Sequence, residues 1–476
     1  MTHQTSVKRG LVWSATERFA TQFIQFLVAV VLARILTPND FGLVAIVYVF
    51  TTIFHTINES GFNTALIHKL DRAAIDYSTA LYTNIVIGMI GYGILFIASP
   101  YIAIFYNTPE LTKIMRYLSL TLVINSLGIV QNAKYTINVD FQSIAKASVT
   151  AAIISGIISI IYAYISHSVY AIVLQSITYS SVNVFLLWIL GRWIPKTGFS
   201  KSSFKELFNY AYKLILARLI SVVFDDIYSL AIGKIYTPTS LAFYNRANSF
   251  QQLLSKNIIN IIQRVSIPIL CKSQNDLPDM RNVLLHFVKI AASVVYPLLA
   301  MLMALGYPLI YVVLGSQWVG AVEYLYFICP LGFFYLISTF NRNVFNATGR
   351  TDWALKSEIV KKCLFVIVFL LTMRYDIKIL LAGLLFDSII EMCYDMHYSK
   401  KQIGIKFSEQ FKNILPILMA SIIMTIAIIL IIQLFTNPYI SLFAGSVTGA
   451  VVYCIICYIC NIANFRSYID KYILRR

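Results

Sequence analysis

Charged residues are scarce in this chain of 476 residues. Asp, Glu, Lys and Arg together make up 12% of it, whereas 58% of the residues are hydrophobic. A soluble protein carries about a quarter charged residues. So few charged side chains cannot cover the surface of a globular protein of this length. The composition therefore excludes an ordinary soluble protein and predicts that lipid surrounds most of the chain.

Cysteines are also few, and they suggest neither disulfides nor a metal site. There are seven, of which Cys454, Cys457 and Cys460 repeat every three residues in an apolar segment. That spacing places them roughly along one face of a helix. No His or carboxylate accompanies them, so a tetrahedral metal site would lack a ligand. We interpret them as small buried hydrophobic residues and expect no metal and no cofactor.

Sequence motifs of common enzymes are missing as well. The chain has no Gly-rich phosphate-binding loop, no HExxH motif and no Ser-His-Asp set in a recognisable context. The first absence excludes ATP hydrolysis by the chain itself. A cleavable signal peptide is not expected either, because Lys8 and Arg9 precede an apolar run that is too long for one and lacks a small-residue cleavage site. We therefore expect that the protein is not an enzyme.

Long apolar segments fill the chain instead. A membrane helix needs roughly 20 mostly apolar residues. Polar stretches at 191–206 and 399–412 separate the segments into groups of six, six and two. The sequence therefore predicts an all-α integral membrane protein with about fourteen transmembrane helices, near 11–36, 41–66, 77–99, 111–134, 144–166, 169–191, 207–235, 239–269, 283–313, 321–345, 355–373, 377–398, 413–435 and 439–461.

Basic residues are distributed unequally between the loops. If the N-terminus is inside, Lys and Arg gather in cytoplasmic loops, whereas the opposite loops TPND, SHSV, GSQWVG and TNP contain none. The segments YNTPELTKIMR and MRYDIK are exceptions. This asymmetry is typical of membrane topology and explains the net charge of +17 better than nucleic-acid binding does. We expect both termini in the cytoplasm and no nucleic-acid partner.

Two parts of the chain repeat at an offset of 200 positions. LARILTPNDFG at 32–42 aligns with IGKIYTPTSLAF at 232–243, and Arg18 aligns with Arg218. Each motif follows the first helix of a six-helix block, so both blocks run in the same direction through the membrane. A parallel repeat of this kind is typical of alternating-access transporters. It predicts two lobes, 1–200 and 201–400, around a central cavity, followed by two further helices in 401–476.

The opening segment, KRGLVWSATERFATQFIQFLVAVVLARILTPNDFGLVAIV, resembles that of Wzx-type polysaccharide flippases. These belong to the multidrug/oligosaccharidyl-lipid/polysaccharide superfamily. The features that carry the resemblance are Trp13, the Glu17-Arg18 pair, the loop at 32–42 and the motif from Tyr244 to Leu253. The resemblance covers roughly residues 5 to 400 and accounts for two extra C-terminal helices.

What the resemblance implies is transfer of an undecaprenyl-diphosphate-linked oligosaccharide, such as an O-antigen or exopolysaccharide unit, to the outer leaflet of the bacterial inner membrane. The expected partners are this lipid-linked oligosaccharide, membrane lipid, an H⁺ or Na⁺ counter-ion and other polysaccharide assembly proteins. The alternatives are a multidrug exporter of the same superfamily and, less favoured, a polysaccharide polymerase or ligase. The latter would be expected to have a sizeable outside loop for its catalytic residues.

Basic residues inside the spans are candidates for binding the diphosphate. A charge in the hydrocarbon costs about 2.5–3.5 kcal/mol on insertion scales, so it usually faces a cavity or a partner. Arg18 and Arg218 occupy equivalent depths, and guanidinium groups bind phosphate oxygens in pairs. Arg246 and Lys256 complete the predicted set. An ion pair of Arg18 with Glu17, or arginines that reach the inner surface, are the structural alternatives.

Amide and hydroxyl side chains form two stripes at helical spacing, which predicts that they line a water-filled cavity. Amides suit sugar hydroxyls because they both donate and accept hydrogen bonds. The predicted cavity-lining residues are Gln22 and Gln25 in the first span and Ser249, Gln252, Asn260 and Gln263 in the eighth.

Acidic residues inside the spans are candidates for cation coupling. Asp225 and Asp226 are adjacent near the middle of the seventh span, and His55 lies one turn before Glu59 in the second. Such groups can bind a proton or Na⁺. An ion pair with Arg218, or a hydrogen-bonded His55–Glu59 contact between helices, are the alternatives.

The twelfth span carries acidic residues four positions apart. Asp387, Glu391 and Asp395 are expected to form salt bridges with Lys361 and Lys362 of the eleventh span. We interpret this set as structural.

Overall fold

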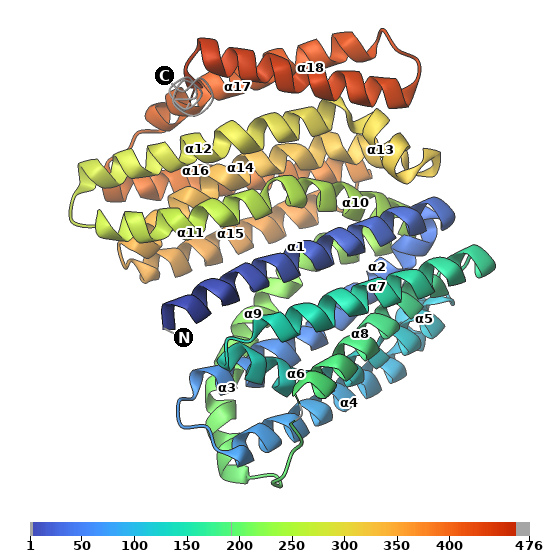
Figure 1. Ribbon diagram of the computed structural model, residues 1–476. Helices are drawn as coiled ribbons and strands as arrows, with labels where there is room; N and C mark the ends of the chain where they lie inside the picture. The colour runs from blue at the N-terminus through green and yellow to red at the C-terminus, as the bar shows by residue number, and fades with distance from the viewer. Residues whose placement is uncertain (1–2, 192, 463–476) are drawn as a thin grey trace. The chain divides into compact units, whose positions relative to one another are not determined.

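The computed structural model describes residues 3–191 and 193–462 (Figure 1). The described backbone is helical nearly throughout and contains no strand, which confirms the predicted all-α class. Helices suit a chain in lipid because each satisfies its own backbone hydrogen bonds. The chain divides into two compact units, Met1–Ala242 (unit 1) and Phe243–Arg476 (unit 2).

Unit 1 contains nine complete α-helices within its described residues, one π-helix and the start of a tenth α-helix. They are α1 (His3–Ile35), α2 (Pro38–Asn58), the π-helix η1 (Glu59–Asn63), α3 (Thr64–His68), α4 (Ala74–Phe105), α5 (Leu111–Leu118), α6 (Leu120–Ile137), α7 (Phe141–Ser166), α8 (Tyr170–Gly191), α9 (Lys201–Ile235) and α10 (Pro238–Leu254), which continues into unit 2.

Small residues allow the helices of unit 1 to pack closely. Helix α7 lies beside α1 and α8 (Figure 1), and Gly156 of α7 contacts Val28 of α1 so closely that a Cβ would lie 2.5 Å from Cγ2 of Val28. Helix α9 packs against α2 and η1. One hydrophobic core of unit 1 is formed by Phe62, Leu66, Ala80, Val130, Leu207 and Ala211, among others.

The repeated Thr-Pro sequences begin helices α2 and α10. Thr37 accepts a hydrogen bond from the Asp40 N–H (3.4 Å), and the Thr37 N–H donates to the Asp40 carboxylate (2.9 Å), which is a capping box. Thr237 likewise accepts from the Ser240 N–H (3.1 Å). Proline follows each threonine at the first helical position, where its missing N–H has no cost. The repeat therefore reflects two equivalent helix starts.

These two helix starts touch each other. A Cβ on Gly42 of α2 would lie 1.8 Å from the carbonyl oxygen of Pro238. Only glycine allows α2 to approach the backbone of α10 so closely.

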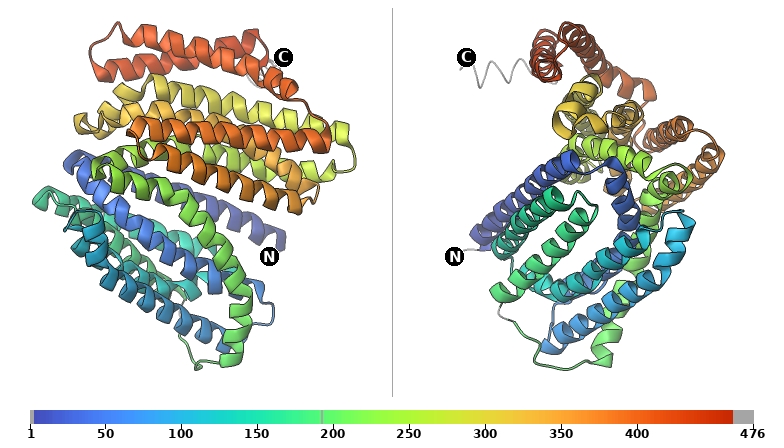
Figure 2. Two further views of the ribbon diagram at one scale, coloured as in Figure 1. Left: turned by 180° about the vertical axis from the view of Figure 1, so that it is seen from behind. Right: turned by 90° about the vertical axis from the view of Figure 1, so that its right-hand side faces the viewer.

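Unit 2 contains the rest of α10 and the remaining helices. They are α11 (Lys256–Lys272), α12 (Leu277–Ala304), α13 (Gly306–Leu314), the short 3₁₀ turn η2 (Ser316–Trp318), α14 (Ala321–Ala347), α15 (Thr351–Thr372), α16 (Ile377–Ile403), α17 (Phe407–Ile432) and α18 (Pro438–Ile459). Helices α17 and α18 pack against each other as a pair (Figure 2), and α17 also packs on α12.

Each of the fourteen predicted spans coincides with a helix or a run of consecutive helices. Ten of the described segments are long and apolar enough to cross a membrane. The segments formed by α9, α10–α11, α15 and α16 fall outside those ten, and all of them carry several charged residues. The number fourteen therefore stays a prediction.

The lobe boundaries at 200 and 400 also stay predictions. Packing divides the chain after Ala242, so α9 lies in unit 1, whereas the repeat assigns residues 201–400 to the second lobe.

Candidate functional site

A large polar hollow of unit 1 lies among α2, η1, α6, α8 and α9. Its volume is about 720 Å³. Most of the lining side chains are polar, which is unusual for a membrane protein interior. They are His55, Asn58, Glu59, Asn63, Thr64, Asn125, Gly128, Ile129, Asn132, Tyr179, Ser180, Asn183, Val184, Leu187, Leu214 and Arg218. We call this the amide cavity.

The π-helix η1 helps to build the amide cavity. Helix α2 continues into η1 at Glu59, where each turn gains about one residue and the side chains rotate relative to a regular helix. Gly61 in η1 has no side chain, and a Cβ there would lie 2.8 Å from Cδ1 of Ile215 on α9. This close approach brings Glu59 and Asn58 to the same cavity as Arg218 of α9. π-Helical turns are frequent at functional sites.

Asn58 has an unusual environment. Asn58 is only 2% exposed, yet neither polar atom of its side chain forms a hydrogen bond with the described residues. The side-chain oxygen of Asn63 is likewise buried without a partner. Buried polar groups in proteins are nearly always hydrogen-bonded. These buried amides therefore have hydrogen-bonding capacity that the described residues do not satisfy.

Opposite charges meet in the amide cavity. Arg218 contributes a guanidinium and Glu59 a carboxylate, and the two groups interact electrostatically. The Glu17 carboxylate of α1 also acts electrostatically on the lining residue Tyr179. The cavity can thus present a cation, a carboxylate and several amides to one molecule.

The structure brings some of the predicted site residues together and separates others. His55, Glu59 and Arg218 line the amide cavity. Arg18, Gln22 and Gln25 are exposed on α1 and are not among the lining residues. Asp225 is exposed and Asp226 half-buried further along α9, also outside the lining. The roles assigned to all of these residues stay predictions.

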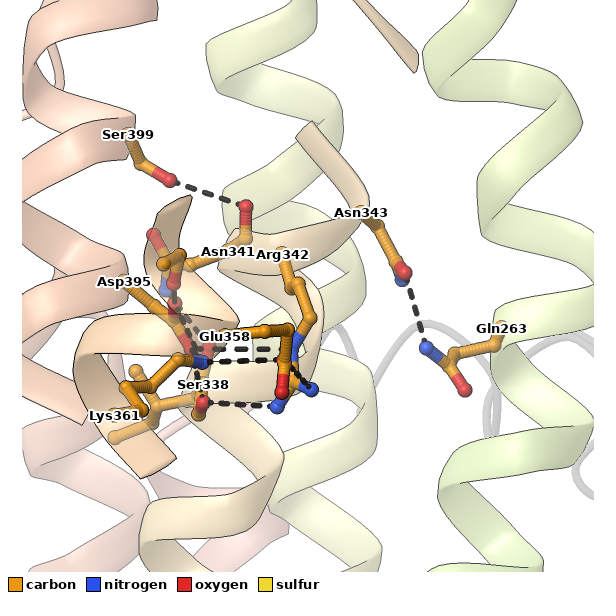
Figure 3. A network of polar contacts seen from close by, with 11 residues as sticks. Gln263, Ser338, Asn341, Arg342, Asn343, Glu358, Lys361, Asp395 and Ser399 are labelled. Carbon is orange, nitrogen blue, oxygen red and sulfur yellow. Dashed lines mark hydrogen bonds and ion pairs between the residues drawn. The ribbon is translucent and has the colours of Figure 1, made fainter. Parts of the chain in front are cut away.

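The polar stripe predicted in the eighth span lies in unit 2 and is divided at Ser255, between α10 and α11. Gln252 and Lys256 line a pocket of about 160 Å³ together with Glu391 of α16. Ser249 and Asn260 are exposed. Gln263 instead donates a hydrogen bond to the Asn343 side chain of α14 (3.0 Å), so it joins two helices (Figure 3).

Arg246 lies against an aromatic ring. Its guanidinium carbon is 5.2 Å from the ring centroid of Trp318, which is fully buried. This distance is typical of a cation–π contact. Its predicted contact with a diphosphate stays a prediction.

A network of ion pairs joins α14, α15 and α16 (Figure 3). The Lys361 ammonium lies 3.0 Å from Asp395, and Ser357 donates to the same carboxylate. Arg342 pairs with Glu358 at 2.9 Å. The expected pairing of Lys361 with the acidic residues of α16 is therefore confirmed for Asp395.

The interpretation of the C-terminal cysteines was partly wrong. Cys457 is buried, but Cys454 and Cys460 are exposed. Helix α18 packs mainly against α17 and also against α13, and Cys454 and Cys460 lie where these contacts do not cover the surface. Within the described residues no group of three His, Cys, Asp or Glu side chains could hold a metal ion.

Sequence reasoning missed much of the amide cavity. Asn125 and Asn132 are seven residues apart on α6, and Tyr179 and Asn183 are four apart on α8. Both spacings place the residues on one helix face. The same search for polar stripes that singled out residues 249–263 would have found them.

Comparisons with known proteins agree with this architecture. Residues 31–323 match the family described as polysaccharide biosynthesis protein. The chain is 26% identical to the teichuronic acid biosynthesis protein TuaB of Bacillus subtilis, over 73% of this chain and 72% of TuaB. It is 22% identical to the lipopolysaccharide biosynthesis protein WzxC of Escherichia coli, over 75% of this chain and 73% of WzxC.

Solved structures show the same fold. The inward closed conformation of the lipid II flippase MurJ matches with a TM-score of 0.74 at 17% identity, over 96% of this chain and 100% of MurJ. An inward-facing multidrug resistance MATE transporter matches with a TM-score of 0.60 at 12% identity, over 84% and 99% of the two chains. The chain is thus a multi-pass membrane protein with a transporter fold, and it belongs to the family of polysaccharide biosynthesis proteins.

Proposed function

We propose that this protein flips an undecaprenyl-diphosphate-linked oligosaccharide from the inner to the outer leaflet of the bacterial inner membrane. The amide cavity is the observation that carries the proposal: a large polar hollow inside a lipid-embedded helical unit, lined by one guanidinium and many amides. Membership in a polysaccharide biosynthesis family and likeness to a lipid II flippase support it.

The lining residues suit the polar part of such a substrate. Arg218 can bind diphosphate oxygens through two parallel hydrogen bonds. Asn58, Asn125, Asn132 and Asn183 can donate to and accept from sugar hydroxyls. The cavity volume of about 720 Å³ falls within the usual range for ligand sites. In this proposal Arg18 is a second diphosphate contact, because it aligns with Arg218 in the sequence repeat.

Transport is coupled to an H⁺ or Na⁺ gradient in this proposal, and Glu59 is the favoured coupling residue. It lines the amide cavity beside Arg218 and His55. A proton or Na⁺ that binds the Glu59 carboxylate would weaken its attraction for Arg218 and leave the guanidinium for phosphate. Asp225 and Asp226 are the alternative coupling pair. In this proposal both termini lie in the cytoplasm, and the distribution of basic residues among the loops supports it.

A multidrug exporter is the second candidate because a MATE transporter shares the fold. The match to the lipid II flippase covers more of this chain, 96% against 84%. The matching family is also named for polysaccharide biosynthesis.

Depletion of the protein in its own host tests these candidates. A flippase predicts that lipid-linked oligosaccharide accumulates on the cytoplasmic leaflet, where an external glycosidase or lectin cannot reach it. A polymerase predicts single units on the outer leaflet. An exporter predicts altered sensitivity to toxic compounds with normal surface glycan, and that result would contradict the proposal.

A further inference from the structure

A second cavity of unit 1 lies among α4, α5, the start of α6, α7 and α8, with a volume of about 790 Å³. It shares no lining residue with the amide cavity. Its wall is rich in aromatic side chains and carries two cations. The aromatic residues are Tyr92, Phe96, Tyr117, Tyr162 and Tyr170, and the cations are Lys113 and Arg116. We call it the tyrosine pocket.

Helix α5 supplies both cations because it is amphipathic. Leu111, Ile114, Met115 and Leu118 are buried on one side, at the three- and four-residue spacing of a helix face. Lys113, Arg116 and Tyr117 lie on the other side and face the pocket. The fold of α5 therefore fixes the two cations in the pocket wall.

Arg116 is held in place by two contacts. Its Nε donates a hydrogen bond to Oγ of Ser99 (3.1 Å), and its guanidinium carbon lies 4.2 Å from the ring centroid of Phe96. The terminal nitrogens of Arg116 hydrogen-bond to none of the described residues. Two adjacent N–H donors in one plane match two oxygens of a phosphate.

Neither of the two cations forms an ion pair with the described residues, although the Glu110 carboxylate acts electrostatically on the lining residue Tyr170. None of the ion pairs formed by the described residues includes Lys113 or Arg116. They also belong to the segment YNTPELTKIMR, which departs from the charge asymmetry of the other loops. The charge asymmetry of the loops therefore does not explain the presence of these two cations. Binding of an anionic ligand would explain it.

Part of the pocket wall is apolar. Leu120, Val173, Leu174 and Ile177 contribute this part. Tyr117 and Tyr170 of the same wall meet edge to face, with ring centroids 6.0 Å apart. Tyrosine favours the boundary between hydrocarbon and polar headgroups. The pocket thus combines two cations, several phenols and an apolar wall, which are the groups that suit a phosphate-bearing lipid.

We propose that the tyrosine pocket binds a lipid by its phosphate headgroup. Arg116 and Lys113 contact the phosphate oxygens, and the hydrocarbon chain lies along Leu120, Val173 and Ile177. The source of the phosphate is either a phospholipid or the phosphorylated carrier lipid. Binding itself does not depend on the proposed transport activity. The proposed orientation would put this pocket in the outer leaflet, and that placement alone rests on the proposed function.

Native mass spectrometry of the purified full chain in detergent tests the proposal. The probes are phosphatidylglycerol, undecaprenyl phosphate and, as a lipid without phosphate, diacylglycerol. In the variant Lys113→Gln/Arg116→Gln, we expect binding of a phosphate lipid to weaken about tenfold or more, because charge-assisted hydrogen bonds are lost. Diacylglycerol binding should not change.

A matched control removes the same net charge elsewhere. Lys146→Gln/Arg264→Gln changes two exposed cations outside the pocket and should bind both phosphate lipids as the wild type does. If the Lys113/Arg116 variant does not fold, Lys113→Gln alone changes one exposed side chain and should still weaken binding.

The pattern of loss identifies the source. A loss for undecaprenyl phosphate alone indicates a carrier-lipid site, and a loss that includes phosphatidylglycerol indicates a general phospholipid site. Unchanged binding of both phosphate lipids, or an equal loss in the control variant, would overturn the proposal. A flipping assay on the same variants measures transport separately from lipid binding. If the protein proves not to be a flippase, the lipid-binding result can still be interpreted.

Discussion

Unit 1 and unit 2 each contain a cluster of buried polar side chains, and these two clusters use their hydrogen-bonding groups differently. In unit 2, Lys361 and Asp395 are 1% and 0% exposed and pair directly at 3.0 Å. In unit 1, Asn58 is 2% exposed and its amide has no partner among the described residues. The first cluster is satisfied by the protein, whereas the second leaves its groups available.

This difference separates stability from function. A buried ion pair that loses one partner leaves an uncompensated charge, which is strongly destabilising. A buried amide without a protein partner costs stability, so the unpartnered amides that line the amide cavity are candidates for ligand binding. We therefore expect substitutions in the Lys361 network to change folding, and substitutions in the amide cavity to change transport.

The largest effect is expected for Lys361→Met. It leaves the Asp395 carboxylate buried without its ammonium, and the free energy of unfolding should fall by about 3–5 kcal/mol. Thermal unfolding in detergent measures this. Lys356→Met on the exposed side of the same helix should be near neutral. The double variant Lys361→Met/Asp395→Leu should regain much of the loss, and an unstable double variant would contradict the ion-pair explanation.

Arg218→Ala should act on transport with little change in stability, because the side chain is exposed to the amide cavity. Loss of charged hydrogen bonds worth about 1.5–3 kcal/mol predicts a decrease in flipping of about ten- to a hundredfold. Arg18→Ala should behave in the same way if the repeat places both arginines on the diphosphate. Glycan export in a complemented deletion strain is the measurement, with Arg264→Ala as the control. Normal export by both variants would eliminate the diphosphate contacts.

Glu59→Gln should remove the dependence of flipping on an ion gradient while some flipping remains, since the amide cannot ionise. Asp225→Asn should keep that dependence, because Asp225 does not line the amide cavity. Reconstituted vesicles with imposed H⁺ or Na⁺ gradients provide the test. The reverse result would assign coupling to Asp225.

The smallest effect is expected for Gln263→Leu in unit 2. It removes one hydrogen bond to Asn343 and should lower stability by about 1 kcal/mol without changing transport. A large transport defect at normal stability would show that the polar residues of α11 line a substrate path, as the sequence predicted, and would weaken the contrast between the units.

Local patterns predicted the fold better than the site. Apolar runs and basic loops identified every helical segment, because the hydrophobic requirement acts on each span separately. The contact of η1 with α9 was not predictable, since a π-helix in ESGFN has no distinctive sequence. Glu59 and Arg218 were singled out for different roles, and their common cavity depends on that contact. Gln263 shows the converse: its helical spacing was read correctly, but the spacing could not reveal that Asn343 faces it.

The contact between Gly42 and Pro238 has a genetic consequence. The atom nearest to a Cβ at position 42 is a main-chain oxygen, at 1.8 Å, rather than part of a side chain. A replacement of Pro238 leaves a carbonyl in its place, so it cannot compensate for a larger residue at position 42. Suppressors of a Gly42 mutation should therefore map to residues whose substitution moves a whole helix. Selection of such suppressors would reveal which helix contacts fix the crossing of α2 and α10.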